Sequence, residues 1–256
     1  RTTINRKHLT IDQKKSSQMS NVKCQMFAAR DKNKDQSYFL WTLTQDQLTH
    51  CLFPIGEYTK PEVRKMAKKF GLPNANKKDS QGICFIGEID LKEFLARHIK
   101  AKPGDIITTS GKKVGRHRGL YSYTIGQRHG FGGGGGIPYY VAGKDFKKNI
   151  LVVAEGPYDN KLFSKKLTAK NINWISSQAP KFPLKCLARI RYRQPLQKCT
   201  IESRIKNQEA RKKTLILNSK FLILFNTPQR AVTPGQSIVF YKSNKMLGGG
   251  IIGGAV

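Results

Sequence analysis

Short strand-like segments recur through the last third of the sequence, at spacings of roughly ten to fifteen residues. Turn-forming residues separate each segment from the next. Such a series is typical of a β-sandwich or a β-barrel, and closure into a barrel hides the edges of many short strands. We therefore expect a C-terminal antiparallel β-barrel over residues 159–256. Its predicted strands are Leu167–Trp174, Lys185–Ile190, Cys199–Arg204, Thr214–Leu217, Phe221–Phe225, Ser237–Tyr241 and Leu247–Ile252, with a charged hairpin end at residues 205–213.

A smaller strand-rich module is expected over residues 88–158. It opens with a predicted helix, Leu91–Ile99, whose Phe94, Leu95 and Ile99 should face inward. The predicted strands are Asp105–Thr109, Lys112–Gly115, Gly119–Thr124, Tyr139–Val141 and Ile150–Ala154. The five glycines at 132–136 lack the strand, helix and Lys-Ser/Thr signature of a phosphate-binding loop. We interpret them as a flexible turn between strands.

Helical patterns dominate residues 22–87. A helix is predicted within Gln36–Cys51, where Thr44 and Gln47 form a capping box. A second is predicted over Lys60–Phe70 and ends at Gly71, with Thr59 as its cap and Pro61 in its first turn. These helices resemble the end of a larger α/β domain. Residues 1–21 are polar without hydrophobic periodicity, which predicts a disordered lead-in.

The charge of the chain indicates a polyanionic partner. Forty-seven Lys and Arg oppose sixteen Asp and Glu, a formal net charge of +31. The basic residues are spread along the chain, which favours a broad nucleic-acid-binding surface over a short localisation signal. No apolar run approaches the roughly 18 residues of a membrane span, so we expect no membrane partner.

The five cysteines, Cys24, Cys51, Cys84, Cys186 and Cys199, are widely spaced and form no CxxC pair. This spacing indicates reduced, intracellular thiols and not a disulfide framework or a zinc site. The five histidines and the carboxylates show no metal-ligand spacing either. We therefore expect no metal site.

Cys84 has an unusual setting among these thiols. It lies between two glycines, Gly82 and Gly87, and follows the cationic pair Lys77 and Lys78. Nearby cations favour the reactive thiolate, and glycines let a substrate approach the backbone. The alternative interpretation is a small buried residue in a strand.

The run Arg189–Gln194 alternates arginines with Ile190 and Tyr192. A tyrosine ring can stack on a base while guanidinium groups hold phosphates. A solvated strand face accounts for the same pattern, and composition alone leaves both interpretations open.

Eight stretches together resemble the tRNA-specific 2-thiouridylases. They are KNKDQSYFLWTL (32–43), LFPIGEYTKPEVRKMAKKFGL (52–72), DSQGICFIG (79–87), GLYSYTIGQRHG (119–130), PYYVAGKD (138–145), KNILVVAEG (148–156), RYRQ (191–194) and AVTPGQSIVFY (231–241). These blocks follow the family order over roughly residues 22–252, which makes the resemblance specific.

The resemblance implies a multidomain α/β plus β protein that replaces the C2 oxygen of the wobble uridine of tRNA by sulfur. Residues 22–87 would be the end of an ATP-pyrophosphatase (PP-loop) domain, residues 88–158 a central domain and the barrel a tRNA-binding domain. The family activates the C2 oxygen with ATP and Mg²⁺, held by an N-terminal part that nothing here matches. We expect a fragment of about two thirds of such an enzyme, inactive alone, which lacks the ATP loop, the resolving cysteine and its aspartate.

The resemblance also assigns residues. Cys84 would be catalytic and carry a persulfide, with Asp79 and Ser80 supporting it. Gln127 and Arg128 would either position RNA or shape their loop. The expected tRNA contacts are Lys34, Asp35, Gln36, Arg191, Tyr192 and Gln236.

The expected partners are tRNA and an upstream protein that donates the persulfide sulfur. We expect a monomer, located in the cytoplasm or alternatively in a mitochondrion. One rival interpretation is a non-catalytic tRNA- or RNA-binding protein that has lost the ATP domain. Another, a redox enzyme that uses Cys84 alone, lacks a resolving CxxC.

Overall fold

A computed structural model describes residues 24–78, 91–129, 136–203 and 220–256. The chain divides into two compact units. The barrel unit comprises Arg1–Asn76, Lys165–Thr227 and Pro234–Val256, and the middle unit comprises Lys77–Ser164 and Pro228–Thr233. The predicted boundaries at residues 87 and 158 stay a prediction.

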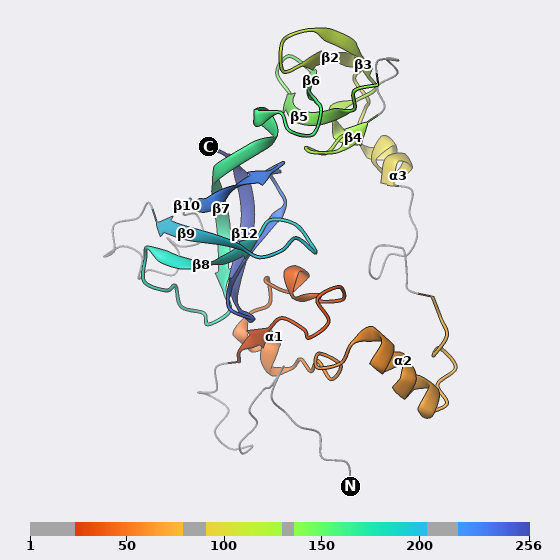
Figure 1. Ribbon diagram of the computed structural model, residues 1–256, viewed down its shortest axis with the longest axis vertical. Coiled ribbons are helices and arrows are strands. Elements are labelled where there is room, and N and C mark those ends of the chain that lie inside the picture. The colour runs from red at the N-terminus through yellow and green to blue at the C-terminus, as the bar shows by residue number, and fades with distance from the viewer. Residues whose placement is uncertain (1–23, 79–90, 130–135, 204–219) are drawn as a thin grey trace. The chain divides into compact units, whose positions relative to one another are not determined.

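Six strands form a closed barrel, coloured green to blue in Figure 1. They follow the order β12-β11-β8-β9-β10-β7, and β7 pairs back onto β12. Closure leaves none of the six at an edge, so the barrel prediction is confirmed. Its strands are β7 (Phe163–Trp174), β8 (Leu184–Arg189), β9 (Gln197–Ser203), β10 (Phe221–Arg230), β11 (Ser237–Lys242) and β12 (Lys245–Ala255). The predicted strand Thr214–Leu217 and hairpin end 205–213 lie outside the described residues.

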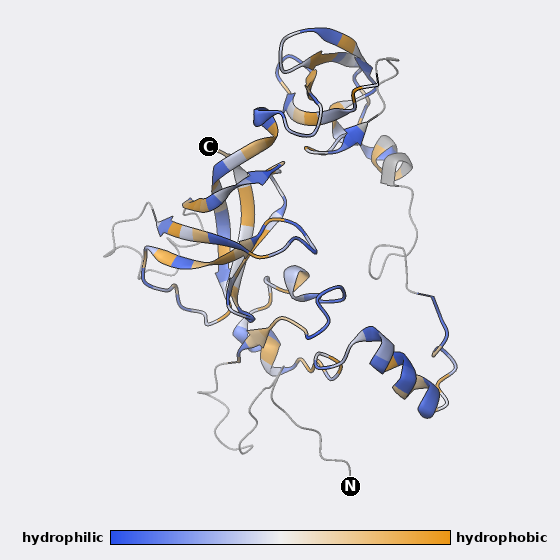
Figure 2. Ribbon diagram, viewed as in Figure 1, coloured by the Kyte–Doolittle hydropathy of each residue, from blue (hydrophilic) through white to orange (hydrophobic). Residues whose placement is uncertain are grey.

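Alternating side chains fill the barrel. Along β10, Phe221, Ile223 and Phe225 are buried and their neighbours are more exposed, the period of two that a sheet requires. In the core, the ring of Trp174 at the end of β7 stacks on that of Phe240 in β11, with centroids 5.8 Å apart. Figure 2 shows the same alternation of hydrophobic and hydrophilic positions along the strands.

Residues 24–53 pack on the barrel. Strand β1 (Met26–Phe27) pairs antiparallel with β12. The helix predicted within Gln36–Cys51 is instead two short helices, η2 (Ser37–Phe39) and α1 (Gln45–Thr49). The capping box of Thr44 and Gln47 is confirmed. Thr44 is the N-cap of α1, so the residues before it lie outside that helix and form a turn. The helical spacing of apolar residues did not predict this turn.

Trp41, in that turn, explains part of the glycine run in β12. A Cβ atom on Gly249 would lie 2.7 Å from the indole ring of Trp41. Gly249 therefore lets the indole approach the strand backbone. The Trp41 Nε1 atom also donates a hydrogen bond to Ser237 Oγ at 2.9 Å, which fixes the turn to β11.

Helix α2 (Lys60–Lys69) begins as predicted, with a capping box of Thr59 and Glu62, and ends one residue before the predicted Phe70. Gly71, the predicted stop, has a φ of 66°. None of its residues is buried. Phe70 directly follows it and is 69% exposed. Figure 2 shows a mainly hydrophilic helix.

The middle unit contains a mixed sheet in the order β3-β2-β6-β5-β4. Strands β2 and β6 run parallel, and the other pairs run antiparallel. Its core contains Ile106, Val141, Leu151 and Val153. The elements are α3 (Leu91–His98), β2 (Gly104–Thr108), β3 (Lys113–His117), η3 (Leu120–Ser122), β4 (Arg128–His129), β5 (Tyr139–Asp145), β6 (Ile150–Glu155) and η4 (Asn160–Leu162).

Two predictions for this unit were wrong. Residues Gly119–Thr124 form a 3₁₀ turn around η3 and not a strand, because the hydrogen bond from Ser122 N to Gly119 O closes the chain locally. Phe94 and Ile99 are 47% and 41% exposed and do not face inward. Periodicity identified the helix but not what surrounds it. Within the described part of the chain, no helix is both long and apolar enough to cross a membrane.

Candidate nucleic-acid interface

Asp35 is the anchor of the loop that follows β1. Its side chain is 1% exposed. Its Oδ1 atom accepts hydrogen bonds from the backbone N–H groups of Ala29 and Ser37, both at 3.1 Å. Ser37 Oγ donates to Oδ2 at 2.9 Å. These bonds fold residues 29–37 around one buried carboxylate.

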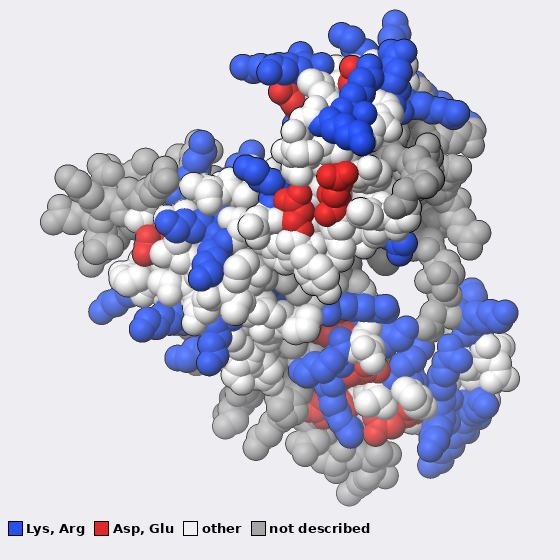
Figure 3. All heavy atoms as spheres, turned by 45° about the horizontal axis from the view of Figure 1, so that its top comes forward, with Lys and Arg blue, Asp and Glu red and all other residues white. Residues whose placement is uncertain are grey.

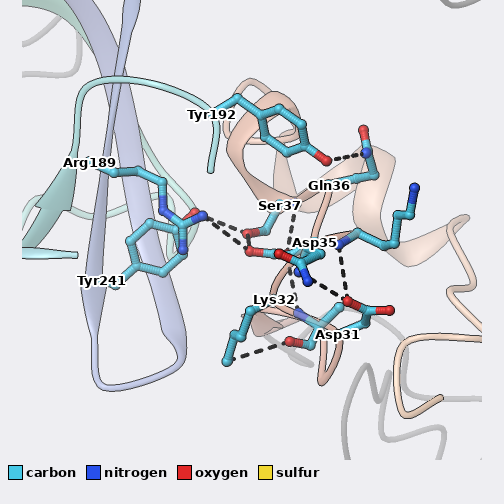
Figure 4. A network of polar contacts seen from close by, with 11 residues as sticks. Asp31, Lys32, Asp35, Gln36, Ser37, Arg189, Tyr192 and Tyr241 are labelled. Carbon is cyan, nitrogen blue, oxygen red and sulfur yellow. Dashed lines mark hydrogen bonds and ion pairs between the residues drawn. The ribbon is translucent and has the colours of Figure 1, made fainter. Parts of the chain in front are cut away.

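The same carboxylate connects the loop to the barrel. Arg189, the last residue of β8, is buried, and its guanidinium lies 3.6 Å from Asp35 Oδ2. The guanidinium also lies over the ring of Tyr241, 5.0 Å from its centroid. The Tyr241 hydroxyl is 2.9 Å from Ser37 Oγ, and burial raises the pKa of Tyr241 to about 12. Figure 4 shows this network between the loop and β8 and β11.

Gln36 points from the anchored loop to the turn between β8 and β9. Its Nε2 atom donates a hydrogen bond to the Tyr192 hydroxyl at 2.9 Å, as Figure 4 shows. The ring of Phe39, which is 54% exposed, lies 4.8 Å from that of Tyr192. The Arg193 guanidinium lies on the Tyr192 ring at 5.2 Å. We call Gln36, Phe39, Tyr192 and Arg193 the Tyr192 surface.

The turn that contains Gln236 is hydrogen-bonded to β12 and, through the next residue, to η2. The Gln236 carbonyl accepts a hydrogen bond from Ile252 N at 2.8 Å, which fixes the turn to β12. The next residue, Ser237, accepts at its carbonyl from the Tyr38 hydroxyl at 2.8 Å. Tyr38 lies in η2 between the Gln36 and Phe39 ends of the Tyr192 surface. Three distant sequence blocks therefore meet around η2.

Lys34 lines a cavity of about 430 Å³ beside the Tyr192 surface. Most of its wall is apolar, with Leu40, Phe53 and Ile55 among the lining residues, while Gln36 and Lys60 also contribute. A cavity of this size and chemistry accommodates a flat apolar group next to cationic nitrogens.

The other predicted site residues lie elsewhere. Gln127 and Arg128 belong to the middle unit. Gln127 Oε1 accepts from Thr124 N at 2.9 Å, so this side chain shapes its own turn, while Arg128 is exposed in β4. Asp79, Ser80 and Cys84 lie outside the described residues.

The surface has the charge that a nucleic-acid interface needs. Figure 3 shows Lys and Arg side chains spread over both units, and fewer Asp and Glu in small groups. Some of these acids are neutralised by neighbours. Lys113 Nζ lies 2.8 Å from Asp105, and hydrogen bonding from Lys113 lowers the pKa of that carboxyl. Most of the positive charge is left for a polyanion.

The starts of α1 and α2 do not suit the phosphates of ATP. At α2 the Glu62 carboxylate accepts from Thr59 N at 2.6 Å, and Asp31 accepts from Lys60 N at 2.9 Å. At α1 the capping box occupies the first turn, next to Asp46. At α2 these carboxylates, and at α1 the Thr44 hydroxyl bound by Gln47 N at 3.3 Å, take up amide donors that a phosphate would use. Across the four described ranges, no group of three His, Cys, Asp or Glu is arranged to hold a metal.

Sequence reasoning missed Ser37 and Tyr241 as parts of the site, and it did not predict that Arg189 is buried. All three are buried and hold the loop through contacts between distant segments, which the sequence pattern does not reveal. Phe39 was also missed. It follows Gln36 closely in sequence, and an aromatic residue next to a predicted contact is the signal that could have identified it.

Three family models match the chain in succession. They are described as the tRNA methyl transferase HUP domain at residues 8–88, the tRNA methyl transferase PRC-barrel domain at 92–155 and the aminomethyltransferase beta-barrel domain at 164–252. The third covers most of the barrel strands and the turn of Tyr192.

Curated relatives match over most of the chain. The tRNA-specific 2-thiouridylase MnmA of Nitrosococcus oceani is 47% identical over 247 residues, which are 94% of this chain and 62% of that protein. The Buchnera aphidicola protein of the same name is 51% identical, over 91% of this chain and 61% of its own. That of Geobacillus thermodenitrificans is 46% identical, over 89% and 58%. The chain thus spans about three fifths of the length of these relatives.

Proposed function

This chain belongs to the tRNA-specific 2-thiouridylase family, and we propose from that membership that it acts in the replacement of the C2 oxygen of a tRNA wobble uridine by sulfur. In this proposal the barrel unit holds the tRNA and Cys84 carries the sulfur. The observation that supports the tRNA part most strongly is the hydrogen bond between Gln36 and Tyr192. It joins two blocks that the resemblance independently assigns to tRNA contact.

The Tyr192 surface suits an unpaired base. Two aromatic rings, Phe39 and Tyr192, lie 4.8 Å apart on one surface, with the Arg193 guanidinium against one of them. Exposed rings stack on unstacked bases, and nearby arginines hold the phosphates that flank them. A tRNA anticodon loop supplies such bases. Arg191, Lys34 and Gln236 are the further contacts that we propose around this surface.

Asp35 has a different role in this proposal. Its carboxylate is buried and already accepts three hydrogen bonds besides facing Arg189. A buried carboxylate would also repel phosphate. Asp35 is therefore a positioning residue that presents Gln36, and not a direct contact of its side chain with tRNA.

Cys84 is the nucleophile of the proposed reaction. A donor protein places a sulfur atom on the Cys84 thiol as a persulfide, and the terminal sulfur attacks C2 of the uridine. The C2 oxygen departs with the phosphoryl group received from ATP as the new C–S bond replaces the C–O bond. A second thiol, which we assign to no described residue, then attacks the Cys84 sulfur. It breaks the S–S bond, forms a disulfide with Cys84 and leaves the outer sulfur on the uridine. In the family, ATP with Mg²⁺ makes that oxygen a leaving group. Because the amides at the starts of α1 and α2 already have acceptors, we assign neither helix start to ATP.

The reaction itself tests the proposal. The protein that carries this chain is supplied with tRNA, ATP, Mg²⁺ and a persulfide donor, and 2-thiouridine is measured by mass spectrometry of digested tRNA. We expect 2-thiouridine with the unaltered protein and none with Cys84→Ser, while tRNA affinity changes less than about twofold, as for a substitution away from the binding surface. The rival function, a non-catalytic RNA-binding protein, predicts tRNA binding and no 2-thiouridine from either protein.

A further inference from the structure

Two cysteines of the barrel meet across neighbouring strands. Cys186 in β8 and Cys199 in β9 are direct partners in the antiparallel register. Their Sγ atoms are 3.6 Å apart. Both are free thiols, and neither belongs to the proposed tRNA surface or to the proposed sulfur transfer.

The backbone places this pair within reach of a disulfide. Directly opposed residues of antiparallel strands have Cα atoms about 4.5–5.5 Å apart. Disulfides span Cα separations of about 4.4–6.8 Å. The two sulfur atoms are already in contact, so side-chain rotation suffices to join them without movement of either strand.

The two thiols differ in exposure. Cys186 is half-buried, whereas Cys199 is only 3% exposed. The hydrogen bond with Cys186 and the burial raise the pKa of Cys199 well above its ordinary range. An oxidant from solvent therefore meets Cys186 first, and Cys199 is the thiol that reacts second.

The position of the pair in the hairpin gives such a bond a local consequence. Strands β8 and β9 are joined by residues 190–196, the turn that contains Arg191, Tyr192 and Arg193. A bond between residues 186 and 199, which are 13 apart, would cross-link this hairpin at the middle of its paired segment. It would restrict the strands that present the turn.

We propose that Cys186 and Cys199 form a cross-strand redox site that is oxidised by low-molecular-weight disulfides of the glutathione type. The Cys186 thiolate attacks the small disulfide, forms a mixed disulfide and releases one small thiol. The Cys199 thiol, which is in contact with the Cys186 sulfur, then attacks it, loses its proton in that step and releases the second small thiol. Two protein thiols are oxidised, the small disulfide is reduced to two thiols, and each protein thiol gives up one proton.

The test is a titration of the native protein with oxidised glutathione. Remaining thiols are blocked with iodoacetamide after denaturation, and peptides are mapped by mass spectrometry. We expect a cross-linked pair of peptides containing Cys186 and Cys199, lighter by two hydrogens and separated by dithiothreitol. The Cys199→Ser variant should instead retain one glutathione on Cys186, and Cys51→Ser, which alters another half-buried cysteine, should form the cross-link unchanged.

Two results would overturn the proposal. One is a glutathione adduct that persists on Cys186 in the unaltered protein while Cys199 remains open to iodoacetamide. The other is that both thiols stay reduced at concentrations that oxidise a small exposed thiol. A second probe, phenylarsine oxide on the reduced protein, should bridge both sulfurs in a one-to-one adduct that either Cys→Ser variant abolishes. The absence of that adduct would equally count against the site.

Discussion

The side-chain amide of Gln36 donates a hydrogen bond to the hydroxyl of Tyr192 at 2.9 Å. Gln36 belongs to the loop after β1 and Tyr192 to the turn between β8 and β9. This bond is not the only link between the two segments. Asp35, next to Gln36, and Arg189, at the end of β8, form an ion pair with an N–O distance of 3.6 Å. The exposed contact thus rests on a buried ion pair, and the two can be tested separately.

Tyr192→Ala should weaken tRNA binding. Loss of one base-stacking ring costs roughly 1–3 kcal/mol, which is about 5- to 150-fold in the dissociation constant. Fluorescence anisotropy with labelled tRNA at fixed salt measures this change. Tyr192→Phe keeps the ring and loses only the Gln36 bond, so its effect should be much smaller. Equal affinities of Tyr192→Ala and the unaltered protein would contradict a stacking role.

Arg189→Met should destabilise the barrel unit. It leaves the Asp35 carboxylate buried without its cation, which costs about 3–5 kcal/mol of unfolding free energy. Urea denaturation followed by circular dichroism measures the loss. The double variant Asp35→Asn/Arg189→Met should recover part of it, because the uncompensated charge is gone. Arg193→Met, at an exposed arginine, serves as the control and should change stability by about 0.5 kcal/mol or less. A similar loss for both arginines would contradict the anchoring role.

Arg189 and Arg193 also show a limit of what the sequence pattern predicts. The alternation of Arg189–Gln194 left RNA contact and a solvated strand face both open, and both place the arginines on an exposed face. However, β8 ends at Arg189 and the chain turns after it. Arg189 is therefore buried against Asp35, and Arg193 reaches the surface. Alternation predicts two faces of a strand but not the residue at which the strand ends.

Arg193→Gln should lower the salt dependence of tRNA binding. A side chain that neutralises one phosphate contributes a slope of roughly 0.7–0.9 in a plot of log affinity against log salt concentration. Affinity is measured over a series of potassium chloride concentrations. Lys170→Gln alters an exposed lysine on β7, on the side of the barrel opposite β8 in the strand order, and should leave the slope unchanged. An identical slope for Arg193→Gln and the unaltered protein would remove Arg193 from the phosphate contacts.

Alkaline pH should destabilise the barrel unit through its buried tyrosines. Burial raises the pKa of Tyr38 and of Tyr241 from the ordinary value of 10.0 to about 12. The unfolded chain loses these protons first, so their stabilising contribution is complete below about pH 10 and is lost as the pH rises through about 12. Absorbance titration of phenolate measures the pKa values. Tyr241→Phe should remove one late-titrating group, and a titration in which all nine tyrosines ionise together near pH 10.0 would contradict the burial effect.

The parts of the fold with local signals were predictable from sequence. The caps at Thr44 and Thr59 predicted the starts of α1 and α2, and the strand spacing predicted the barrel. Caps and spacing are local signals, because they depend on residues close in the chain. The partner of each strand depends on contacts between distant residues. Thus five scattered cysteines indicated no pairing, although the register of β8 and β9 places Cys186 opposite Cys199. Similarly, Asp35 matched a contact motif, but its burial follows only from the fold.

The most direct test is to cross-link tRNA to the protein by ultraviolet light and to map the attached nucleotides by peptide mass spectrometry. If the loop after β1, the β8–β9 turn and the Gln236 turn form one tRNA-binding surface, adducts should concentrate on peptides that contain Phe39 and Tyr192. Tyr192→Ala should reduce the adducts at Phe39 as well, since both rings would hold the same bases. Adducts confined to other parts of the chain, with none at either ring, would contradict the account.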